Sequence, residues 1–340
     1  MRDHGFHPVR IARVVPETPD AISLVLEVPD DRRDEFAYRA GQFVTFRLDI
    51  DGQTHLRSYS MSSSPDVGDA FTVTVKRVQG GVVSNWLCDT SRPGTEVETT
   101  FPAGVFCLTT NEDPVVALAG GSGITPVFSL IKTALATTTR RVRLLYANRD
   151  AESVIFQREL DELVAKHSGR FEVVHHLDVD NGFITADDVR SFVGPDSTAS
   201  DLYVCGPGPF MDTVEGALLG VGVTPPRIHI ERFIPSEAPP ASEPARPTGT
   251  RVTIEIGGRV ETADYRAGTT ILQTARALGM SPPFSCEAGN CATCMAKCVE
   301  GSVSMHVNNA LLDDEVADGW ILTCQSVPTT PTVRVVYEPD

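Results

Sequence analysis

The stretch that decides the fold reads Cys286-Glu287-Ala288-Gly289-Asn290-Cys291-Ala292-Thr293-Cys294, and a further cysteine follows at Cys324. Four residues separate Cys286 from Cys291, two separate Cys291 from Cys294, and twenty-nine separate Cys294 from Cys324. Proteins that hold a [2Fe-2S] cluster through four thiolates use this spacing. Thiolates are soft ligands for iron, and the small residues between them suit a tight loop around the cluster. The pattern therefore predicts an iron-sulfur site with these four cysteines as ligands.

Two other uses of the cysteines are weaker. A structural zinc site usually pairs two short Cys-x-x-Cys segments, and this pattern has only one. A disulfide framework is weaker still. Eight cysteines, four of them in one cluster pattern, need a reducing compartment or an assembly system that keeps thiols free. The other four are Cys88, Cys107, Cys205 and Cys298.

Length and composition indicate a globular protein of several domains. The chain has 340 residues, and at about 150 residues per domain we expect two or three domains, with three preferred. Hydrophobic residues make up 41% and charged residues 22% of the chain, and no apolar run reaches the roughly 20 residues that span a bilayer. The amino terminus lacks the apolar core and small-residue cleavage site of a secretory signal. We therefore expect a cytoplasmic protein without a membrane segment.

The formal net charge of -16 argues against nucleic acid as a partner, because phosphate binding needs clustered Lys and Arg. The acidity has two explanations. It is either a generally solvated acidic surface or a patch that steers a basic electron-transfer partner toward the protein.

The first part of the chain reads as a series of short strands. We expect strands at 9–15, 21–28, 42–48, 56–61 and 70–78, and strands of such even spacing suggest a closed antiparallel barrel. The segment Arg57-Ser58-Tyr59-Ser60 alone is equally consistent with an ordinary half-exposed strand. Gly80-Gly81 is more informative because it precedes a short helix expected at 84–89, and an uncovered helix amino terminus binds phosphate.

From residue 114 to 233 the pattern changes to alternating strands and helices. We expect strands at 115–119, 142–147, 171–177, 202–205 and 227–233, with helices that end near 136, span 153–167, and follow 205. Such alternation predicts a doubly wound parallel sheet, whose ligand crevice lies at the carboxyl ends of its strands. Two glycine loops, 120–126 and 205–211, fall at those ends. The first departs from Gly-x-Gly-x-x-Gly, so a fingerprint search alone would score it poorly.

The last part of the chain begins after a proline-rich segment. Residues 235–249 cannot bury a core and read as a semi-extended linker. We then expect a β-hairpin from 251–256 and 259–263, an amphipathic helix at 269–278 and a final strand at 333–337. The expected domains are therefore 1–111, 112–234 and 250–340, with the linker at 235–249.

Five motifs in order make the chain resemble the ferredoxin-NADP reductase superfamily. They are Arg57-x-Tyr59-Ser60, Gly81-x-x-Ser84, Gly120-Gly121-x-Gly123-Ile124-Thr125-Pro126, Cys205-Gly206-Pro207-Gly208-Pro209 and Glu231-x-Phe233. With its carboxyl-terminal cysteine pattern, the chain resembles the reductase components of multicomponent bacterial oxygenases, and most closely those of 3-ketosteroid 9α-hydroxylases. Local similarity at 75–77, 84–89 and 145–150 carries the steroid resemblance. The family plan implies a flavin barrel, an α/β nicotinamide-nucleotide domain and an α+β β-grasp ferredoxin domain.

The resemblance also implies a flavin site. It places Tyr59 against the flavin, Ser60 near its N5 and Arg57 on the phosphates. Ser84 and the loop before it take the pyrophosphate, which FAD has and FMN lacks, so FAD is expected, although phthalate-dioxygenase-type reductases of similar plan use FMN. The remaining expected flavin-site residues are Val75, Lys76, Gly81, Val82 and Val83.

For the nicotinamide nucleotide, the resemblance implies a site formed by Gly120, Gly121, Gly123 and Thr125, with Cys205, Gly206 and Pro207 beside the reacting ring. Phe233 takes the place of the aromatic residue that covers the flavin in relatives, with Glu231 nearby. The alternatives are a buried strand-end thiol for Cys205 and a core aromatic for Phe233. The tip Asn148-Arg149-Asp150 offers both an acid for a ribose hydroxyl and an arginine for a 2′-phosphate, which leaves the choice open. The steroid resemblance favours NADH, with NADPH possible.

Together these features predict an enzyme that converts hydride into single electrons, from NADH to FAD to [2Fe-2S], for a separate oxygenase component. The expected catalytic residues are Ser60, Cys205, Glu231 and Phe233. A Rieske-type steroid hydroxylase is the expected partner, and another monooxygenase system, of diiron or aromatic-ring/phenylacetyl-CoA type, is the alternative. A metal-binding module without enzymatic activity and a self-sufficient flavoprotein oxidase are weaker alternatives, the second because the chain has no room for an oxygenase domain.

Overall fold

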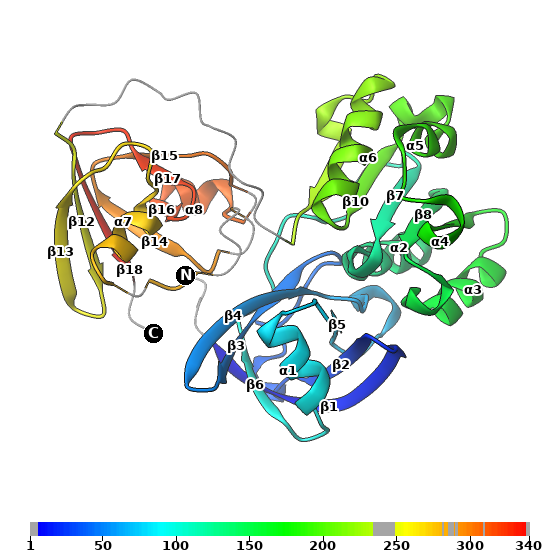
Figure 1. Cartoon of the computed structure of the whole chain (residues 1–340), viewed down its shortest axis with the longest axis horizontal. Coiled ribbons are helices and arrows are strands. Elements are labelled where there is room, and N and C mark those ends of the chain that lie inside the picture. The colour runs from blue at the N-terminus through cyan, green and yellow to red at the C-terminus, as the bar shows by residue number, and fades with distance from the viewer. Residues whose placement is uncertain are drawn as a thin grey trace. The chain divides into compact units, whose positions relative to one another are not determined.

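The structure is a computed structural model that describes residues 6–233, 249–280, 282–284, 289, 292–308 and 310–337. It divides into two compact units, one with the two amino-terminal folds and one with the carboxyl-terminal fold, and each is described by itself (Figure 1). Within the described ranges, no helix is both long and apolar enough to cross a membrane.

The amino-terminal fold is an antiparallel barrel of six strands. Its sheet order is β4-β3-β6-β1-β2-β5, and an antiparallel bridge from Met61 to Val73 joins the two outer strands. Alternate residues of β1, such as Val9 and Ile11, are buried in the barrel core. The predicted closed barrel is thus confirmed. The strands are β1 (His7–Thr18), β2 (Ala21–Glu27), β3 (Phe43–Ile50), β4 (Gln53–Ser60), β5 (Thr72–Lys76) and β6 (Glu96–Thr99).

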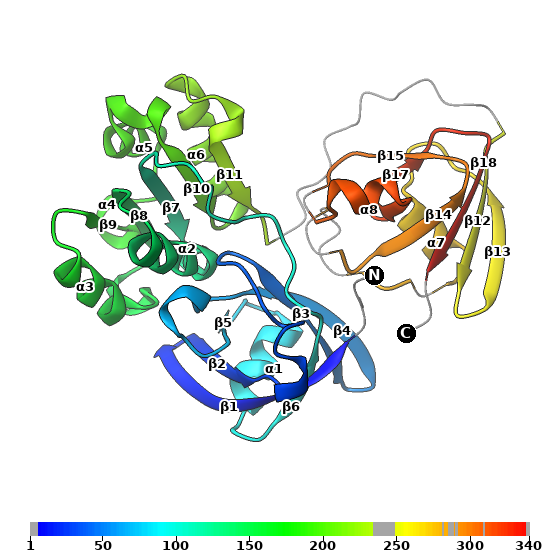
Figure 2. The ribbon, with the colours of Figure 1, turned by 180° about the vertical axis from the view of Figure 1, so that it is seen from behind.

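The second fold is the predicted doubly wound sheet. Its five strands are all parallel, in the order β11-β10-β7-β8-β9. Helices α2 (Ile124–Thr137) and α3 (Gln157–Lys166) cover one face, and α5 (Ala186–Val193) and α6 (Gly208–Gly220) cover the other (Figure 2). The strands are β7 (Val115–Gly120), β8 (Val142–Asn148), β9 (Phe171–Leu177), β10 (Asp201–Cys205) and β11 (Ile228–Glu231).

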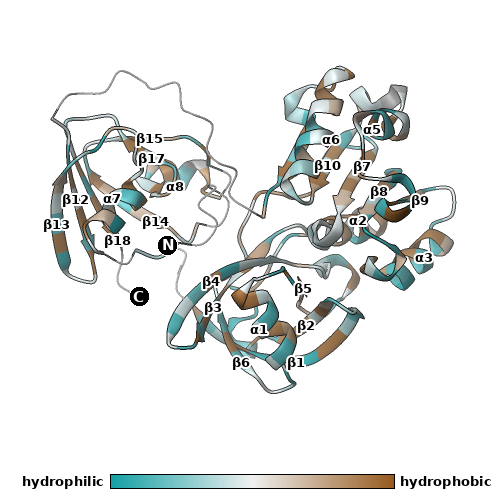
Figure 3. Ribbon diagram, in the orientation of Figure 1, coloured by the Kyte–Doolittle hydropathy of each residue, from teal (hydrophilic) through white to brown (hydrophobic). Residues whose placement is uncertain are grey.

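Burial on both faces explains why the central strands read as continuous apolar runs. All six residues of β7 are buried, and the strand is apolar along most of its length (Figure 3). Val115 and Ala117 pack toward α2, whereas Val116 and Leu118 pack toward α6. The side chains therefore alternate between two cores.

The helices differ from the sequence prediction in two ways: one expected helix is divided, and α5 and the short helices α4 (Asp178–Asn181) and α8 (Asp313–Ala317) were not predicted. The helix expected at 153–167 is divided into a 3-10 turn, η4 (Ala151–Ser153), and α3, because Asp150 caps the turn and Phe156 adopts φ +64°. The Phe156 ring stacks on Phe128 at 4.5 Å between centroids. This aromatic contact stabilises the point at which the expected helix is interrupted. Helix α5 was not predicted, although Thr185 and Asp188 form a capping box that marks its start.

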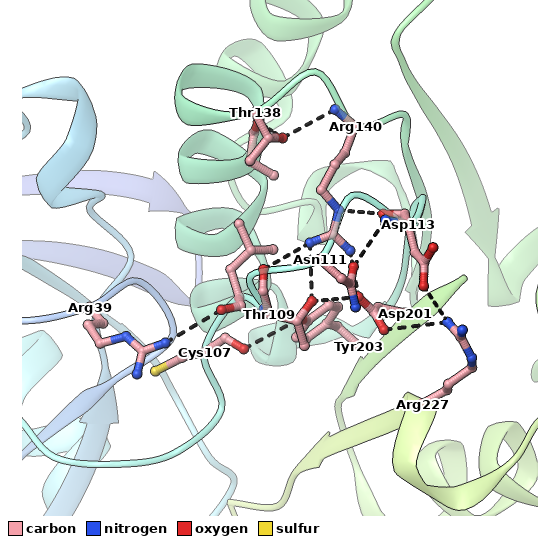
Figure 4. A network of polar contacts seen from close by, with 12 residues as sticks. Arg39, Cys107, Thr109, Asn111, Asp113, Thr138, Arg140, Asp201, Tyr203 and Arg227 are labelled. Atoms are coloured by element: carbon pink, nitrogen blue, oxygen red, sulfur yellow. Dashed lines mark hydrogen bonds and ion pairs between the residues drawn. The ribbon is translucent and has the colours of Figure 1, made fainter. Parts of the chain in front are cut away.

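The connector between barrel and nucleotide fold is anchored at the amino-terminal edge of the parallel sheet (Figure 4). The buried guanidinium of Arg140 donates to the Thr109 carbonyl at 3.1 Å and to Asp201 Oδ2 at 2.6 Å. The Thr109 amide donates to the Tyr203 hydroxyl, which in turn donates to the Cys107 carbonyl. These bonds satisfy the buried polar groups that a loop at this edge would otherwise leave unpaired.

The carboxyl-terminal unit has the α+β ferredoxin-like plan that the sequence predicted. Its main sheet runs β13-β12-β18-β14-β16, with β12 and β18 parallel, and β15 pairs with β17 separately. Gly257 and Gly258 both have positive φ in the hairpin turn, as a two-glycine turn requires. The elements are β12 (Arg251–Ile256), β13 (Arg259–Asp264), α7 (Ile271–Ala277), β14 (Met295–Glu300), β15 (Val303–Met305), α8 (Asp313–Ala317), β16 (Trp320–Leu322), β17 (Ser326–Pro328) and β18 (Thr332–Tyr337).

Candidate functional site

The nucleotide crevice is defined by the order of the parallel strands. The chain places β8 and β9 on one side of β7, and then β10 and β11 on the other. The carboxyl ends of β7 and β10 therefore form the switch point at which ligands bind in doubly wound sheets. The predicted glycine loops lie at these two ends, since β7 ends at Gly120 and β10 at Cys205.

The two glycine loops pack so closely that side chains cannot fit between them. A Cβ atom on Gly123 would lie 2.0 Å from the Cys205 carbonyl oxygen, and one on Gly206 would lie 2.7 Å from the Phe210 ring. A Cβ on Gly120 would lie 3.0 Å from Pro207 Cδ. Glycine at these positions lets the backbones of the two loops approach each other directly at the switch point, where doubly wound sheets bind dinucleotides.

The first glycine loop is a 3-10 turn, η3 (Gly121–Gly123), that leads directly into α2. No side chain caps the start of α2 at Gly123. The Ile124 amide donates to the carbonyls of Gly121 and Ser122, which closes the turn onto the helix. Thr125 donates its hydroxyl to the Ser122 carbonyl at 3.0 Å. The predicted residues Gly120, Gly121, Gly123 and Thr125 thus belong to one short structural unit.

A residue without a predicted role supports this loop. The fully buried Tyr146, at the end of β8, donates its hydroxyl to the Gly121 carbonyl at 3.1 Å and accepts from the Ile155 amide. Burial raises the pKa of Tyr146, so the hydroxyl keeps the proton that it donates. A tyrosine at the end of a predicted buried strand was the available signal, because a buried phenol needs a polar partner.

Cys205 and Glu231 are register partners at the ends of β10 and β11. Cys205 is fully buried, and that burial raises the pKa of its thiol well above the usual value, with Glu231 adding to the rise. The thiol is therefore a neutral, buried group at the end of β10, which agrees with the alternative of a buried strand-end thiol. Phe233 lies just beyond β11 and is 38% exposed, so it is not a core aromatic.

The tip after β8 holds an ion pair. Arg149 Nε donates to Asp150 Oδ2 at 2.7 Å, and Asp150 Oδ1 accepts from the Ser153 amide and hydroxyl. The hydrogen bonds from Arg149 and Ser153 lower the pKa of Asp150 to about 2. The arginine and the acid that left the nucleotide choice open are thus paired with each other.

The predicted flavin strand β4 carries Arg57, Tyr59 and Ser60. Ser60 is buried, and the half-buried Tyr59 ring makes an edge contact with Phe46 at 5.4 Å between centroids. Arg57 is exposed and donates to the carbonyl of Leu56. The strand therefore presents a ring and a cation at its carboxyl half, as a flavin and its phosphates require.

The barrel strand β5 meets the nucleotide loop. Its last residue, Lys76, has Nζ 3.9 Å from Asp20 Oδ2, and a Cβ on Gly121 would lie 3.6 Å from the same nitrogen. Val75 beside it is fully buried. Residues predicted for the flavin and residues predicted for the nucleotide are thus brought together from separate folds.

Helix α1 (Val82–Thr90) begins at the predicted pyrophosphate loop. Gly81 is its N-cap and supplies no side-chain cap, and Gly80 has φ +71°. The Ser84 hydroxyl accepts from the Val78 amide at 3.1 Å, which fixes the loop. Val83 is buried and Val82 is exposed. The free first-turn amides fit a pyrophosphate.

Two of the four predicted cluster ligands lie within the described residues. Cys294 and Cys324 are buried, and the Cys324 amide donates to Cys294 Sγ at 3.5 Å. A Cβ on Gly289 would lie 2.7 Å from the Val307 carbonyl oxygen, so Gly289 itself packs closely against that backbone. Cys286 and Cys291 lie outside the described residues, which without them contain no cluster of three metal-ligating side chains. The amide on sulfur is the kind of contact that an iron-sulfur thiolate makes.

Comparison with known families matches each of the three folds. Residues 9–107 match the oxidoreductase FAD-binding domain, residues 117–216 the oxidoreductase NAD-binding domain, and residues 254–329 the 2Fe-2S iron-sulfur cluster binding domain. The fold and these matches define a flavin- and nicotinamide-dependent oxidoreductase with its own [2Fe-2S] domain. Its cofactors are FAD, NADH and the cluster.

Similar proteins cover nearly the whole chain. The 3-ketosteroid-9-alpha-monooxygenase ferredoxin reductase component of Rhodococcus rhodochrous is 39% identical over 98% of each chain. One subunit of the 1,2-phenylacetyl-CoA epoxidase of Escherichia coli (strain K12) is 33% identical over 98% of each chain. The solved structure of phthalate dioxygenase reductase is 26% identical, with a TM-score of 0.59 and 98% of each chain covered. The chain belongs to this family of oxygenase reductases and is the electron-delivering component of a multicomponent system.

Proposed function

We propose that the residues described above form one electron-transfer site, in which each group of residues binds a different part of the cofactors. Tyr59 and Ser60 hold the flavin ring, while Arg57 and the start of α1 hold its phosphates. The loops Gly120–Gly123 and 205–207 hold the nicotinamide nucleotide. The approach of Lys76 to Gly121 is the observation that supports this division most, because it joins the two halves at one place. Domain limits of 1–111, 112–234 and 250–340, with a linker at 235–249, accommodate the three matched ranges.

The cofactors supply the redox chemistry: nicotinamide gives an electron pair as hydride, flavin passes electrons on singly, and a [2Fe-2S] cluster takes one at a time. The chain orients the reacting groups and shields them from water. The neutral Cys205 thiol fills the nicotinamide side of the crevice without introducing charge. Phe233 would cover the exposed flavin face, with Glu231 two residues before it on the same segment. Cys286, Cys291, Cys294 and Cys324 hold the iron.

The proposed nucleotide is NADH rather than NADPH. A 2′-phosphate needs a free cation, and the Arg149 guanidinium is already bonded to Asp150 and Ser153. Asp150 stays ionised because its pKa is about 2, so its negative charge opposes a phosphate at the tip. A ribose with both hydroxyls suits this pair better.

The proposed partner is a Rieske-type oxygenase that hydroxylates a steroid or a comparable hydrophobic substrate. The 39% identity to the steroid monooxygenase reductase supports this partner, and the full-length likeness to phthalate dioxygenase reductase agrees with it. The 33% identity to the phenylacetyl-CoA epoxidase component makes a diiron oxygenase the second candidate. Both relatives cover 98% of this chain, and the higher identity to the steroid monooxygenase component favours the steroid system.

The experiment that tests the partner is NADH-driven product formation with each purified oxygenase. We expect turnover of a 3-ketosteroid with the Rieske-type component and none with the diiron component; the reverse result would overturn the assignment. If the acidic charge of the chain steers docking, raising salt should slow reduction of the partner but leave flavin reduction by NADH much less affected. Equal salt sensitivity of the two steps would show that charge does not steer docking of the partner.

A further inference from the structure

A polar seam joins the barrel to the nucleotide fold immediately after the flavin strand. It is made by residues 62–69, which follow β4 and include the 3-10 turn η2 (Pro65–Val67), and by one face of α2. The Ser129 hydroxyl donates to the Ser63 carbonyl at 2.5 Å, and the Ser64 and Thr133 hydroxyls lie 2.7 Å apart. All four residues are buried. These two hydroxyl contacts are therefore closed off from solvent, whereas residues 65–69 of the seam are exposed.

Two carboxylates extend the seam. Thr133 donates to Asp66 Oδ2 at 2.9 Å, and Lys132 pairs with Asp69, which also accepts from the Ser64 amide at 3.0 Å. The ammonium group of Lys132 lies 4.5 Å from the centre of the Phe128 ring. Because Lys132 and Thr133 follow Ser129 by three and four positions, each lies beside Ser129 on the helix surface. One face of α2 thus bonds the barrel at several points.

The hydrogen bonds of the seam restrict the orientation of the barrel relative to the nucleotide fold more than the apolar contacts do. Ala21, Ala40 and Phe106 of the barrel pack into the core of the nucleotide fold, but apolar contact is not directional. An open groove of about 290 Å³, lined in part by Asp69 and Lys132, borders the seam. Hydrogen bonds restrict angle as well as distance, so the seam fixes how the two folds are turned toward each other.

The seam links two segments that are each covalently adjacent to one half of the site. Residue 62 is two positions after Ser60, and α2 begins at Ile124, immediately after the glycine loop. Ser129 is less than two turns from that start. A small shift at the seam would therefore move the nicotinamide loop relative to the flavin strand.

We propose that Ser64, Ser129 and Thr133 are positioning residues that set the approach of the nicotinamide to the flavin for hydride transfer. The inference rests on the proposed placement of both cofactors. Reacting atoms must be held about 3–3.5 Å apart, and a misplacement of about 1 Å can cost about 100-fold in rate. The seam would control the rate of hydride transfer without contacting either cofactor.

The test uses the holoprotein and follows flavin reduction by NADH anaerobically in stopped flow. The double variant Ser64→Ala/Thr133→Val removes both hydroxyls of the pair, so neither hydroxyl is left buried without the other. Their other partner, Asp66, is exposed, so its amide and carboxylate can bond water instead. We expect its limiting reduction rate to fall about 10- to 100-fold, with FAD content and the Kd for NADH little changed. The long-wavelength absorbance of the stacked nicotinamide–flavin pair should weaken in parallel.

Two further variants separate positioning from general damage. Thr133→Ser keeps the hydroxyl and should keep most of the wild-type rate. Thr137→Val, one turn further along α2, removes a hydroxyl that bonds the Thr133 carbonyl of its own helix, and should leave the rate unchanged. If the double variant loses its flavin, Ser129→Ala, which removes a single bond to the barrel, takes its place.

The outcomes are distinguishable. A wild-type limiting rate and absorbance in the double variant, or in Ser129→Ala where it replaces the double variant, would overturn the proposal. The single variant Thr133→Val is compared with Thr133→Ser. Equal losses of the reduction rate in these two would overturn the proposal too, since they would show that the hydroxyl does not affect hydride transfer. If wild-type protein itself were not reduced by NADH, the proposed function would fail, and the positioning role with it.

Discussion

The Cα of Gly123 lies so close to the carbonyl of Cys205 that a Cβ atom on Gly123 would sit 2.0 Å from that oxygen and 2.6 Å from the Gly206 nitrogen. Real Cβ atoms do not approach backbone this closely, and neither neighbour is a flexible side-chain end. The loops that follow β7 and β10 therefore pack against each other at a position where no side chain fits.

Replacing Gly123 with Ala should separate the two loops and displace the nicotinamide. We expect flavin reduction by NADH to fall by about 100-fold or more, because the displacement approaches 1 Å. Gly216→Ala is the matched control: Gly216 lies within α6 with open space around its Cα, and Ala in a helix interior is stabilising by about 0.5–1 kcal/mol. Stopped-flow reduction measures both variants. A wild-type rate in Gly123→Ala would show that the close packing of the two loops is not needed to position the nicotinamide.

The buried thiol of Cys205 predicts a particular pH behaviour. Because its pKa is raised by burial, the rate of flavin reduction should show no thiol ionisation between about pH 6 and pH 9. The folded protein keeps a proton that the unfolded chain releases, so this contribution to stability is complete below the ordinary thiol pKa and is lost as pH rises above it.

The rate profile and the melting temperatures of wild type and Cys205→Ala check this point. The advantage of wild type over the variant should shrink above about pH 9. A thiol ionisation near neutral pH in the rate profile of wild type, absent from the variant, would mean that the thiol is solvated or paired with a cation.

Nucleotide preference should depend on the Arg149–Asp150 pair. Asp150→Asn keeps an acceptor for the Ser153 amide but removes the negative charge. The freed Arg149 can then bond a 2′-phosphate, and a hydrogen bond to a charged group contributes about 1.5–3 kcal/mol. The ratio of kcat/KM for NADPH over NADH should therefore rise about tenfold or more. Asp161→Asn, whose partner is Gln157 on the same helix, is the control. A wild-type preference for NADPH would reverse the assignment.

The cluster ligands should be separable from the flavin site. Cys291→Ser should abolish the [2Fe-2S] spectrum yet leave flavin reduction by NADH intact, because the cysteines belong to a separate fold. Cys298→Ser is the matched control, since Cys298 lies on β14 with its thiol directed to the Glu300 carbonyl. Visible and EPR spectra report both. Loss of flavin along with the cluster in Cys291→Ser would contradict the modular arrangement.

Local patterns in the sequence predicted what depends on spacing and on glycine. The cysteine spacing, the two loops at strand ends and the hairpin at Gly257-Gly258 each reflect one nearby constraint, so they can be identified without the fold. The parallel sheet was predicted from another pattern visible along the chain, the alternation of strands with helices.

Features that join distant segments could not be predicted. The contact of Lys76 with the Gly121 loop, and the seam between Ser64 and Thr133, depend on how two folds meet, which no local pattern encodes. The positive φ of Phe156, which breaks the expected helix at 153–167, is likewise a tertiary effect, because its ring is held by Phe128. The Arg149–Asp150 pair was visible in sequence, but its mutual bonding was not.

The electron-transfer account is tested most directly by mixing the holoprotein with NADH without oxygen while recording flavin absorbance and the EPR signal of the reduced cluster. We expect the flavin to be bleached first and the cluster signal to follow, and addition of the oxygenase should then reoxidise the cluster. A cluster that stayed oxidised after the flavin had been reduced would contradict the proposed path from NADH through FAD to [2Fe-2S].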